Sequence, residues 1–137
     1  MMSRAPDGRE PKWNNYSTTS ELIIRLKNEL NKLINENHVK PEDVVILTPK
    51  GKDKSLLKEG LQLGNFVLTW SIYGKGIQVR TIQSFKGLEK LVVLIAELDR
   101  MSLDIEKLLY VGTSRARTEL ICFYSDELES FITRKGL

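Results

Sequence analysis

The stretch LVVLIAELDRMSLDIEKLLYVGTSRARTELICFY, Leu91 to Tyr124, decides the fold class. It begins with a predicted strand, Leu91 to Leu98, whose residues Leu91 to Ala96 form a continuous apolar run, and it ends with a second predicted strand, ELICFY, that starts at Glu119. Continuous apolar runs are typical of strands that are covered on both faces, as in parallel sheets. Between them, Ser102 to Ala116 has apolar residues at helical spacing. The order strand, helix, strand predicts a βαβ unit and therefore an α/β fold with a mainly parallel sheet flanked by helices.

Further strands are predicted on the N-terminal side of this unit. Val44 to Leu47 is another continuous aliphatic run, and Ile77 to Thr81 alternates like a strand. Phe66 to Ile72 is a candidate strand, and Trp13 to Tyr16 is a candidate edge strand. A short polar helix is predicted over Lys54 to Glu59.

Two helices are predicted near the ends of the chain. Thr18 and Glu21 form a capping-box pattern, which predicts a helix from about Ser20 to Glu36. The segment SDELESFITR, from Ser125, predicts a closing helix. The length of 137 residues suits a single domain over residues 13–137, preceded by a flexible segment over residues 1–12.

Composition limits the possible functions. The formal net charge of +3 permits a polyanionic partner without requiring one. A single cysteine, Cys122, leaves no intrachain disulfide and no cysteine-based zinc site, and suggests a cytoplasmic protein. No apolar run is long enough to span a bilayer. We expect no membrane partner.

A phosphate-binding loop is not recognisable in the sequence. Such a loop needs G-x-x-x-x-G-K-[ST]. Lys52 follows Gly51, but Asp53 comes next, and Lys75 is followed by Gly76. We therefore expect the isolated chain neither to cradle a triphosphate nor to hydrolyse one.

Three other polar features have simple structural interpretations. Glu97 and Asp99 follow an apolar run, as Mg²⁺ ligands do, but we interpret them as polar residues of the loop that ends a strand. His38 lies in a turn without a metal-ligand cluster. Cys122 lies inside an apolar strand and is interpreted as a small core residue. No metal site is predicted.

Two segments remain as candidates for function. In VRTIQSFKGLEK, a strand ends at Thr81, and Thr81, Gln83 and Ser84 carry groups that hydrogen-bond phosphate oxygens. Lys86 adds positive charge, and Gly87 permits close approach of the backbone to a ligand. The alternative is a plain polar connection between strands. Because ligands of parallel sheets lie at the carboxyl ends of strands, the loops after Leu47, Thr81 and Leu98 are the places to search.

The second candidate segment contains two arginines, Arg115 and Arg117. On a helical wheel they fall on opposite flanks of the apolar stripe, so different roles are expected for them. Gly112 and Ala116 make that stripe thin enough for close approach to a sheet. Arginine at the border of a packed face is suited to bind phosphate bidentately.

Together the two segments resemble the UvrD/Rep-like superfamily 1 helicases. TIQSFKGLE looks like motif V of that family, commonly TIHSxKGLE, and LLYVGTSRAR looks like motif VI, commonly LLYVALTRAR. DVVILTP occupies the place of the motif IV strand. Gln83 stands where the family commonly has histidine. The interval from Pro49 to Val79 is too short for an inserted accessory domain, as in the compact members of the family.

The resemblance implies the C-terminal, second RecA-like motor domain of an ATP-dependent DNA helicase. ATP with Mg²⁺ would be bound jointly with a separate N-terminal motor domain. Arg115 would be the catalytic arginine finger, and Gly87 and Glu89 would bind nucleotide beside it. Thr81, Gln83, Ser84 and Lys86 would face single-stranded or partly duplex DNA. Glu97 and Asp99 would lie in the family's buried strand, away from the Mg²⁺ site.

Two alternatives stay open at this point. The same fold could be a degenerate, non-enzymatic module that binds nucleic acid or a protein. A flavodoxin-like or receiver-like domain would need an acidic pocket or a flavin loop after the first buried strand, where TPKGKDK is basic.

Overall fold

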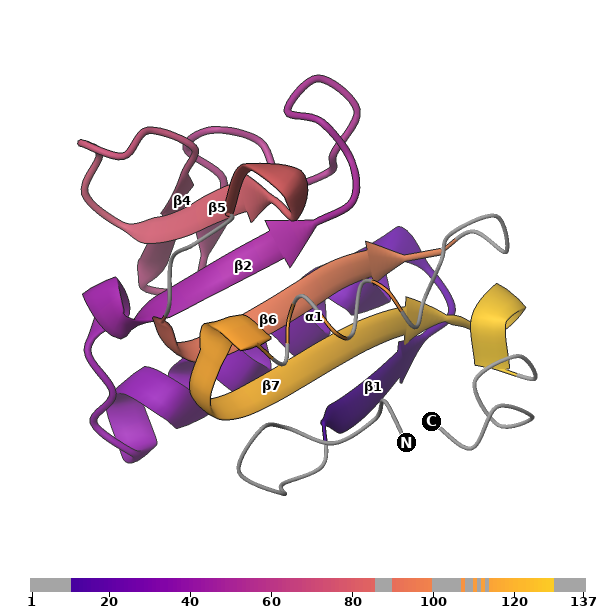
Figure 1. Ribbon diagram of the computed structural model, residues 1–137, viewed down its shortest axis with the longest axis horizontal. Helices are drawn as coiled ribbons and strands as arrows, with labels where there is room; N and C mark the ends of the chain where they lie inside the picture. The colour runs from indigo at the N-terminus through magenta and orange to yellow at the C-terminus, as the bar shows by residue number, and fades with distance from the viewer. Residues whose placement is uncertain are drawn as a thin grey trace.

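A computed structural model describes residues 11–85, 90–99, 107, 110, 112 and 114–129 of the chain. Within this part a seven-stranded sheet has the order β1-β7-β6-β2-β5-β4-β3 (Figure 1). All neighbouring strands are parallel except the antiparallel pair β3 and β4. The strands are β1 (Lys12–Tyr16), β2 (Val44–Thr48), β3 (Gln62–Leu63), β4 (Phe66–Thr69), β5 (Ile77–Thr81), β6 (Lys90–Leu98) and β7 (Ala116–Ser125). The predicted mainly parallel α/β sheet is confirmed.

The centre of the sheet is formed by the continuous apolar runs. Every residue of β2 is buried, and so are the last seven residues of β6. β2 lies between β5 and β6, with Ile46 opposite Val79 on one side and Leu94 on the other. Apart from Thr48 and Glu97 near the carboxyl ends, the buried residues are aliphatic because both faces of these strands are covered.

Helix α1 (Thr19–Leu30) begins where the capping box predicts. The Thr18 hydroxyl accepts a hydrogen bond from the Glu21 backbone N–H at 3.1 Å. The Glu21 carboxylate accepts from the Ser17 backbone N–H at 2.8 Å. The helix continues as a wide π-helical segment η1 (Asn31–Glu36), and the chain then turns at exposed His38, whose φ is 61°.

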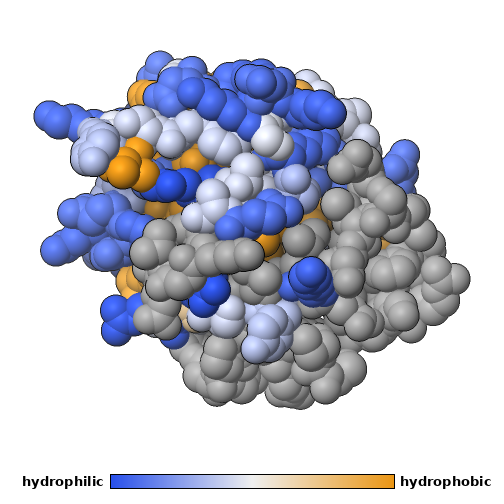
Figure 2. Space-filling model, turned by 45° about the horizontal axis from the view of Figure 1, so that its top comes forward, coloured by the Kyte–Doolittle hydropathy of each residue, from blue (hydrophilic) through white to orange (hydrophobic). Residues whose placement is uncertain are grey.

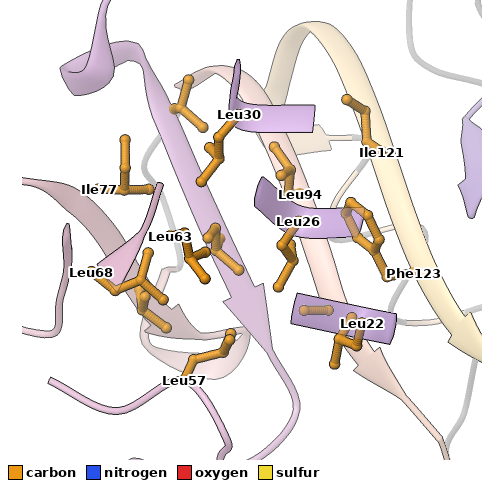
Figure 3. Close-up of a cluster of buried hydrophobic side chains, with 14 of the residues drawn as sticks. Leu22, Leu26, Leu30, Leu57, Leu63, Leu68, Ile77, Leu94, Ile121 and Phe123 are labelled. Carbon is orange, nitrogen blue, oxygen red and sulfur yellow. The ribbon is translucent and has the colours of Figure 1, made fainter. Parts of the chain in front are cut away.

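One face of the sheet packs against α1. Leucines spaced along α1 meet side chains from β6, β7 and the segment between β2 and β4 (Figure 3). The labelled members are Leu22, Leu26, Leu30, Leu57, Leu63, Leu68, Ile77, Leu94, Ile121 and Phe123, all with at most 1% exposure. The leucines at helical spacing therefore lie on one face of α1, and this face forms one side of the core.

A second apolar cluster covers the opposite face. It contains the alternate residues of the same strands, such as Val45, Val93 and Cys122. Gly112 lies against this cluster, since an added Cβ would be 2.6 Å from Ile95 Cδ1. The predicted close approach at Gly112 is confirmed.

Several predicted elements differ from the structure. Lys54 to Glu59 is a non-helical loop. β7 begins at Ala116, which was predicted to end a helix, while most of Ser102 to Ala116 lies outside the described residues. Short 3-10 turns occur at η2 (Pro41–Asp43), η3 (Gln83–Phe85) and η4 (Asp126–Leu128), the last at the start of the predicted closing helix. No helix of the described part is long and apolar enough to cross a membrane.

Candidate functional site

The carboxyl edge of the sheet holds the first group of predicted site residues. Thr81 ends β5 beside Thr48 of β2, and the Ile82 backbone N–H donates to the Thr48 carbonyl at 3.1 Å. The chain then turns through η3, where the Ser84 N–H donates to the Thr81 hydroxyl at 3.1 Å. Gln83 and Ser84 are exposed. Both residues therefore lie at the surface at the end of β5, where the Ser84 hydroxyl also donates to the Thr81 carbonyl at 3.0 Å.

A buried carboxylate organises the same edge. Glu97 is 0% exposed and has a φ of 62°. Its carboxylate accepts hydrogen bonds from the hydroxyls of Thr48 and Ser55 and from the Leu56 backbone N–H. These partners come from β2 and from the loop that follows it. The interpretation of Glu97 as a loop residue is wrong, whereas its placement in a buried strand, which the resemblance implies, agrees with the structure, because β6 runs to Leu98 and the carboxylate is enclosed.

Lys50 and Asp99 lie just outside this buried group. Lys50 Nζ is 2.6 Å from Asp99 Oδ2 and 3.8 Å from Glu97 Oε2. The lysine thus compensates two carboxylates at the ends of β2 and β6. No group of three residues suited to hold a metal ion occurs within the described part of the chain.

The amino edge of the sheet holds Arg115. Lys90, the first residue of β6, is paired with Ala116, the first residue of β7. Arg115 immediately precedes this pair and is half-buried, and its Nε is buried with no hydrogen-bond partner. A buried donor without a partner costs free energy, so the fold leaves the Nε of this guanidinium unsatisfied.

The predicted site residues are therefore divided between opposite edges of the sheet. Thr81, Gln83 and Ser84 lie at the carboxyl edge, whereas Arg115 lies at the amino edge. The expectation that chemistry would concentrate at the carboxyl ends of strands does not describe Arg115, because that residue comes before a strand. Lys86, Gly87 and Glu89 lie outside the described residues.

Arg117 differs from its predicted placement. It lies in β7 rather than on a helix, and it is exposed and has an interaction partner. The helical wheel was wrong here because the helix gives way to the strand at Ala116. Cys122 is fully buried, and burial raises the pKa of its thiol, as a core residue requires.

The segment that contains both predicted motifs also matches a known family. Residues 76–122 match the family model described as the UvrD-like helicase C-terminal domain. The predicted resemblance to UvrD-like helicase C-terminal domains is confirmed over these residues. A comparison with curated proteins gives no match.

A solved structure shares the architecture of this chain. It is the crystal structure of the C-terminal domain of a possible DNA helicase from Lactobacillus plantarum WCFS1. The TM-score is 0.68 and the sequence identity is 18%, over 84% of this chain and 73% of that one. At this identity the likeness concerns the fold, which is the RecA-like α/β sheet of helicase C-terminal domains.

The buried carboxylate and the orphaned Arg115 Nε were not recognisable from the sequence. The partners of Glu97 lie more than 40 positions away, at Thr48 and Ser55. An acidic residue at the end of a long apolar run was the available signal. Its interpretation required knowledge of which loop would cover it.

Proposed function

We propose that the chain is the C-terminal motor domain of an ATP-dependent DNA helicase. In this proposal Arg115 is an arginine finger, aimed at nucleotide that a separate N-terminal motor domain holds. The single observation that carries the proposal is the half-buried Arg115 guanidinium, whose Nε has no partner in the fold. The UvrD-like match over residues 76–122 supports the assignment because it includes this residue.

The chemistry of guanidinium fits this role. It is planar, always charged and able to form two parallel hydrogen bonds to phosphate oxygens. Gly112 lies against the sheet and β7 begins directly after Arg115, so the backbone at Arg115 has a restricted position. ATP with Mg²⁺ would supply the phosphoanhydride that is cleaved. Arg115 would neutralise the charge that develops on the transferred phosphoryl group.

The carboxyl edge would contact the nucleic acid. The exposed Gln83 and Ser84 and the half-buried Thr81 offer neutral polar groups at the end of β5. Neutral donors position a phosphate backbone without reading its sequence. We therefore expect weak, sequence-independent binding of single strands. Because the chain has a formal net charge of +3, this binding should weaken as salt is raised.

The test compares arginine variants in an enzyme that contains both motor domains. Arg115→Ala should lower DNA-stimulated ATP turnover by about 10³-fold or more, the range observed for arginine fingers. Arg115→Lys should recover little of this loss, because an ammonium group lacks the planar fork. Arg117→Ala is the matched control, and its turnover should fall much less.

Two results would contradict the proposal. If the two-domain enzyme with Arg115→Ala kept full ATP turnover, Arg115 would not be an arginine finger. DNA-stimulated ATP hydrolysis by the pure isolated chain would show that the nucleotide site does not need a second domain.

A further inference from the structure

The loop that leaves β2 carries a concentration of positive charge that the proposed function does not use. This basic loop, Pro49–Lys58, contains four lysines and one aspartate. Its net charge therefore equals the formal net charge of +3 of the whole chain. In Figure 1 it is the magenta loop beyond the tip of β2. That end of the molecule comes forward in Figure 2, where hydrophilic side chains dominate the upper surface.

The basic loop is fixed to the sheet. The Glu97 carboxylate accepts hydrogen bonds from the Ser55 hydroxyl and the Leu56 N–H, and the Leu57 side chain is fully buried. Inside the loop, the backbone N–H groups of Lys54 and Ser55 donate to the Gly51 carbonyl at 3.0 and 2.9 Å. Lysines on such a braced loop lose less conformational freedom on binding than lysines on a free segment.

An open cavity lies on this loop. Its volume is about 420 Å³, and its described lining residues are Pro49, Lys50, Gly51 and Lys54. An added Cβ at Gly51 would meet no atom within 4 Å, and its φ is not in the left-handed region. Neither packing nor backbone conformation therefore requires glycine there, and the space above it is free.

The charges around the cavity are unequal. Lys50 already faces Asp99 and Glu97, and the Lys58 ammonium donates to the Asp53 carbonyl at 2.9 Å. Lys54 is exposed, lines the cavity and has no ion pair with a described residue. The uncompensated positive charge of the cavity therefore rests on Lys54.

The cavity also lies next to the residues expected to contact nucleic acid. Thr48, which precedes Pro49, is paired with Thr81, and its carbonyl accepts from the Ile82 N–H. Hydroxyl groups at Thr81 and Ser84 and the ammonium of Lys54 thus occur along one edge of the sheet. Phosphates repeat along a nucleic acid strand, so one strand can reach both positions.

We propose that the basic loop binds a backbone phosphate of single-stranded nucleic acid, with Lys54 as its ammonium contact. The inference rests on the proposed function in the choice of nucleic acid as the ligand. It adds a second contact region, encoded after β2, to the one encoded after β5. Glu97 acts on this region as a positioning residue, since it holds the loop without reaching the cavity ligand.

The test measures binding of a fluorescein-labelled oligothymidylate by fluorescence anisotropy across a salt series. Each phosphate contact to a single strand contributes a slope of about 0.7 in log K against log salt. Lys54→Ala should therefore reduce the slope by about 0.7 and weaken binding by about fivefold at 0.1 M salt. Lys40→Ala is the matched control, because Lys40 is exposed and precedes β2 at the opposite edge. Its slope should equal that of the unmodified chain, and both variants should keep their melting temperatures.

The outcomes separate this inference from the proposed function. If Lys54→Ala and Lys40→Ala weakened oligothymidylate binding equally, the effect would be general charge attraction, and the loop site would be overturned. Unchanged binding in Lys54→Ala, with a loss on Ser84→Ala, would overturn the loop site and leave the motor-domain proposal standing. In a competition experiment at constant ionic strength, inorganic phosphate or oligoglutamate could displace the labelled oligothymidylate. Such displacement would assign the cavity to another anion and overturn the loop site. The turnover of Arg115→Ala is independent of all these results.

Discussion

The two edges of the sheet differ in how their charged side chains are satisfied. At the carboxyl edge, the buried Glu97 carboxylate accepts three hydrogen bonds from the chain itself. At the amino edge, Arg115 keeps a buried Nε without any partner. Removing one member of a buried hydrogen-bonded charge network is strongly destabilising, because its partners are left unpaired. Removing a donor that has no partner breaks no hydrogen bond. We therefore expect substitutions at the carboxyl edge to lower the free energy of unfolding. Substitution of Arg115 at the amino edge should instead lower ATP turnover.

The largest effect on stability is expected for Glu97→Ala. The change removes the acceptor of two buried hydroxyls and of the partly buried Leu56 N–H, and it leaves Lys50 beside Asp99 alone. Loss of one member of a buried charged network costs about 3–5 kcal/mol in the free energy of unfolding. Glu97→Gln, which keeps an acceptor oxygen, should lose less. Urea unfolding measures both, and a loss below about 1 kcal/mol for the alanine variant would show that the network contributes little.

A smaller loss is expected from Gly76→Ala, just before β5 at the amino edge. The φ of Gly76 is 135°, and an added Cβ would lie 2.2 Å from the Val67 carbonyl oxygen. Strain of this kind costs about 1–3 kcal/mol. Gly51→Ala is the control and should change stability by less than about 0.5 kcal/mol, because nothing lies near its Cβ. Equal melting temperatures for the two variants would mean that the turn before β5 is not strained.

Thr18→Ala removes the N-cap of α1 and should lower the free energy of unfolding by about 1 kcal/mol. The neighbouring Thr19→Ala lies inside the helix and makes no capping hydrogen bond among the described contacts, so it should be close to neutral. Thermal unfolding followed by circular dichroism compares them. If Thr19→Ala costs as much as Thr18→Ala, the start of the helix is misplaced.

The smallest effect on stability is expected for Arg115→Ala. Because its Nε has no partner, removing the side chain should change the free energy of unfolding by less than about 0.5 kcal/mol. Arg117→Ala should be mildly destabilising, since that side chain has a partner. The contrast between the edges would fail if Arg115→Ala unfolded the isolated chain, because Arg115 would then be a structural residue.

Much of the sheet could be predicted from local sequence. The runs at Val44 to Leu47 and Leu91 to Ala96 form parallel strands because aliphatic side chains suit positions covered on both faces. The capping pattern at Thr18 placed the start of α1 for an equally local reason. Motifs resembling a helicase family identified the domain type before any contact was known.

The differences arise where distant residues decide the local structure. Lys54 to Glu59 has a helical composition, but Glu97 draws Ser55 and Leu56 into a loop instead. Arg117 continues a helical pattern, but pairing of Ala116 with Lys90 starts a strand first. The position of Arg115 at the amino edge follows from the same pairing. None of these contacts leaves a signal in the neighbouring sequence.

The pairing of β1 with β7 has a consequence for how the chain folds. Lys12 lies opposite Ile121, so two adjacent strands come from positions about 110 residues apart. During synthesis, β1 has no neighbour in the sheet until β7 has left the ribosome. The leucine face of α1 is also incompletely buried until β7 is made, because Ile121 and Phe123 of β7 belong to the same cluster. We therefore expect the strands around β2 to assemble first, and β1 to join the sheet in the last step.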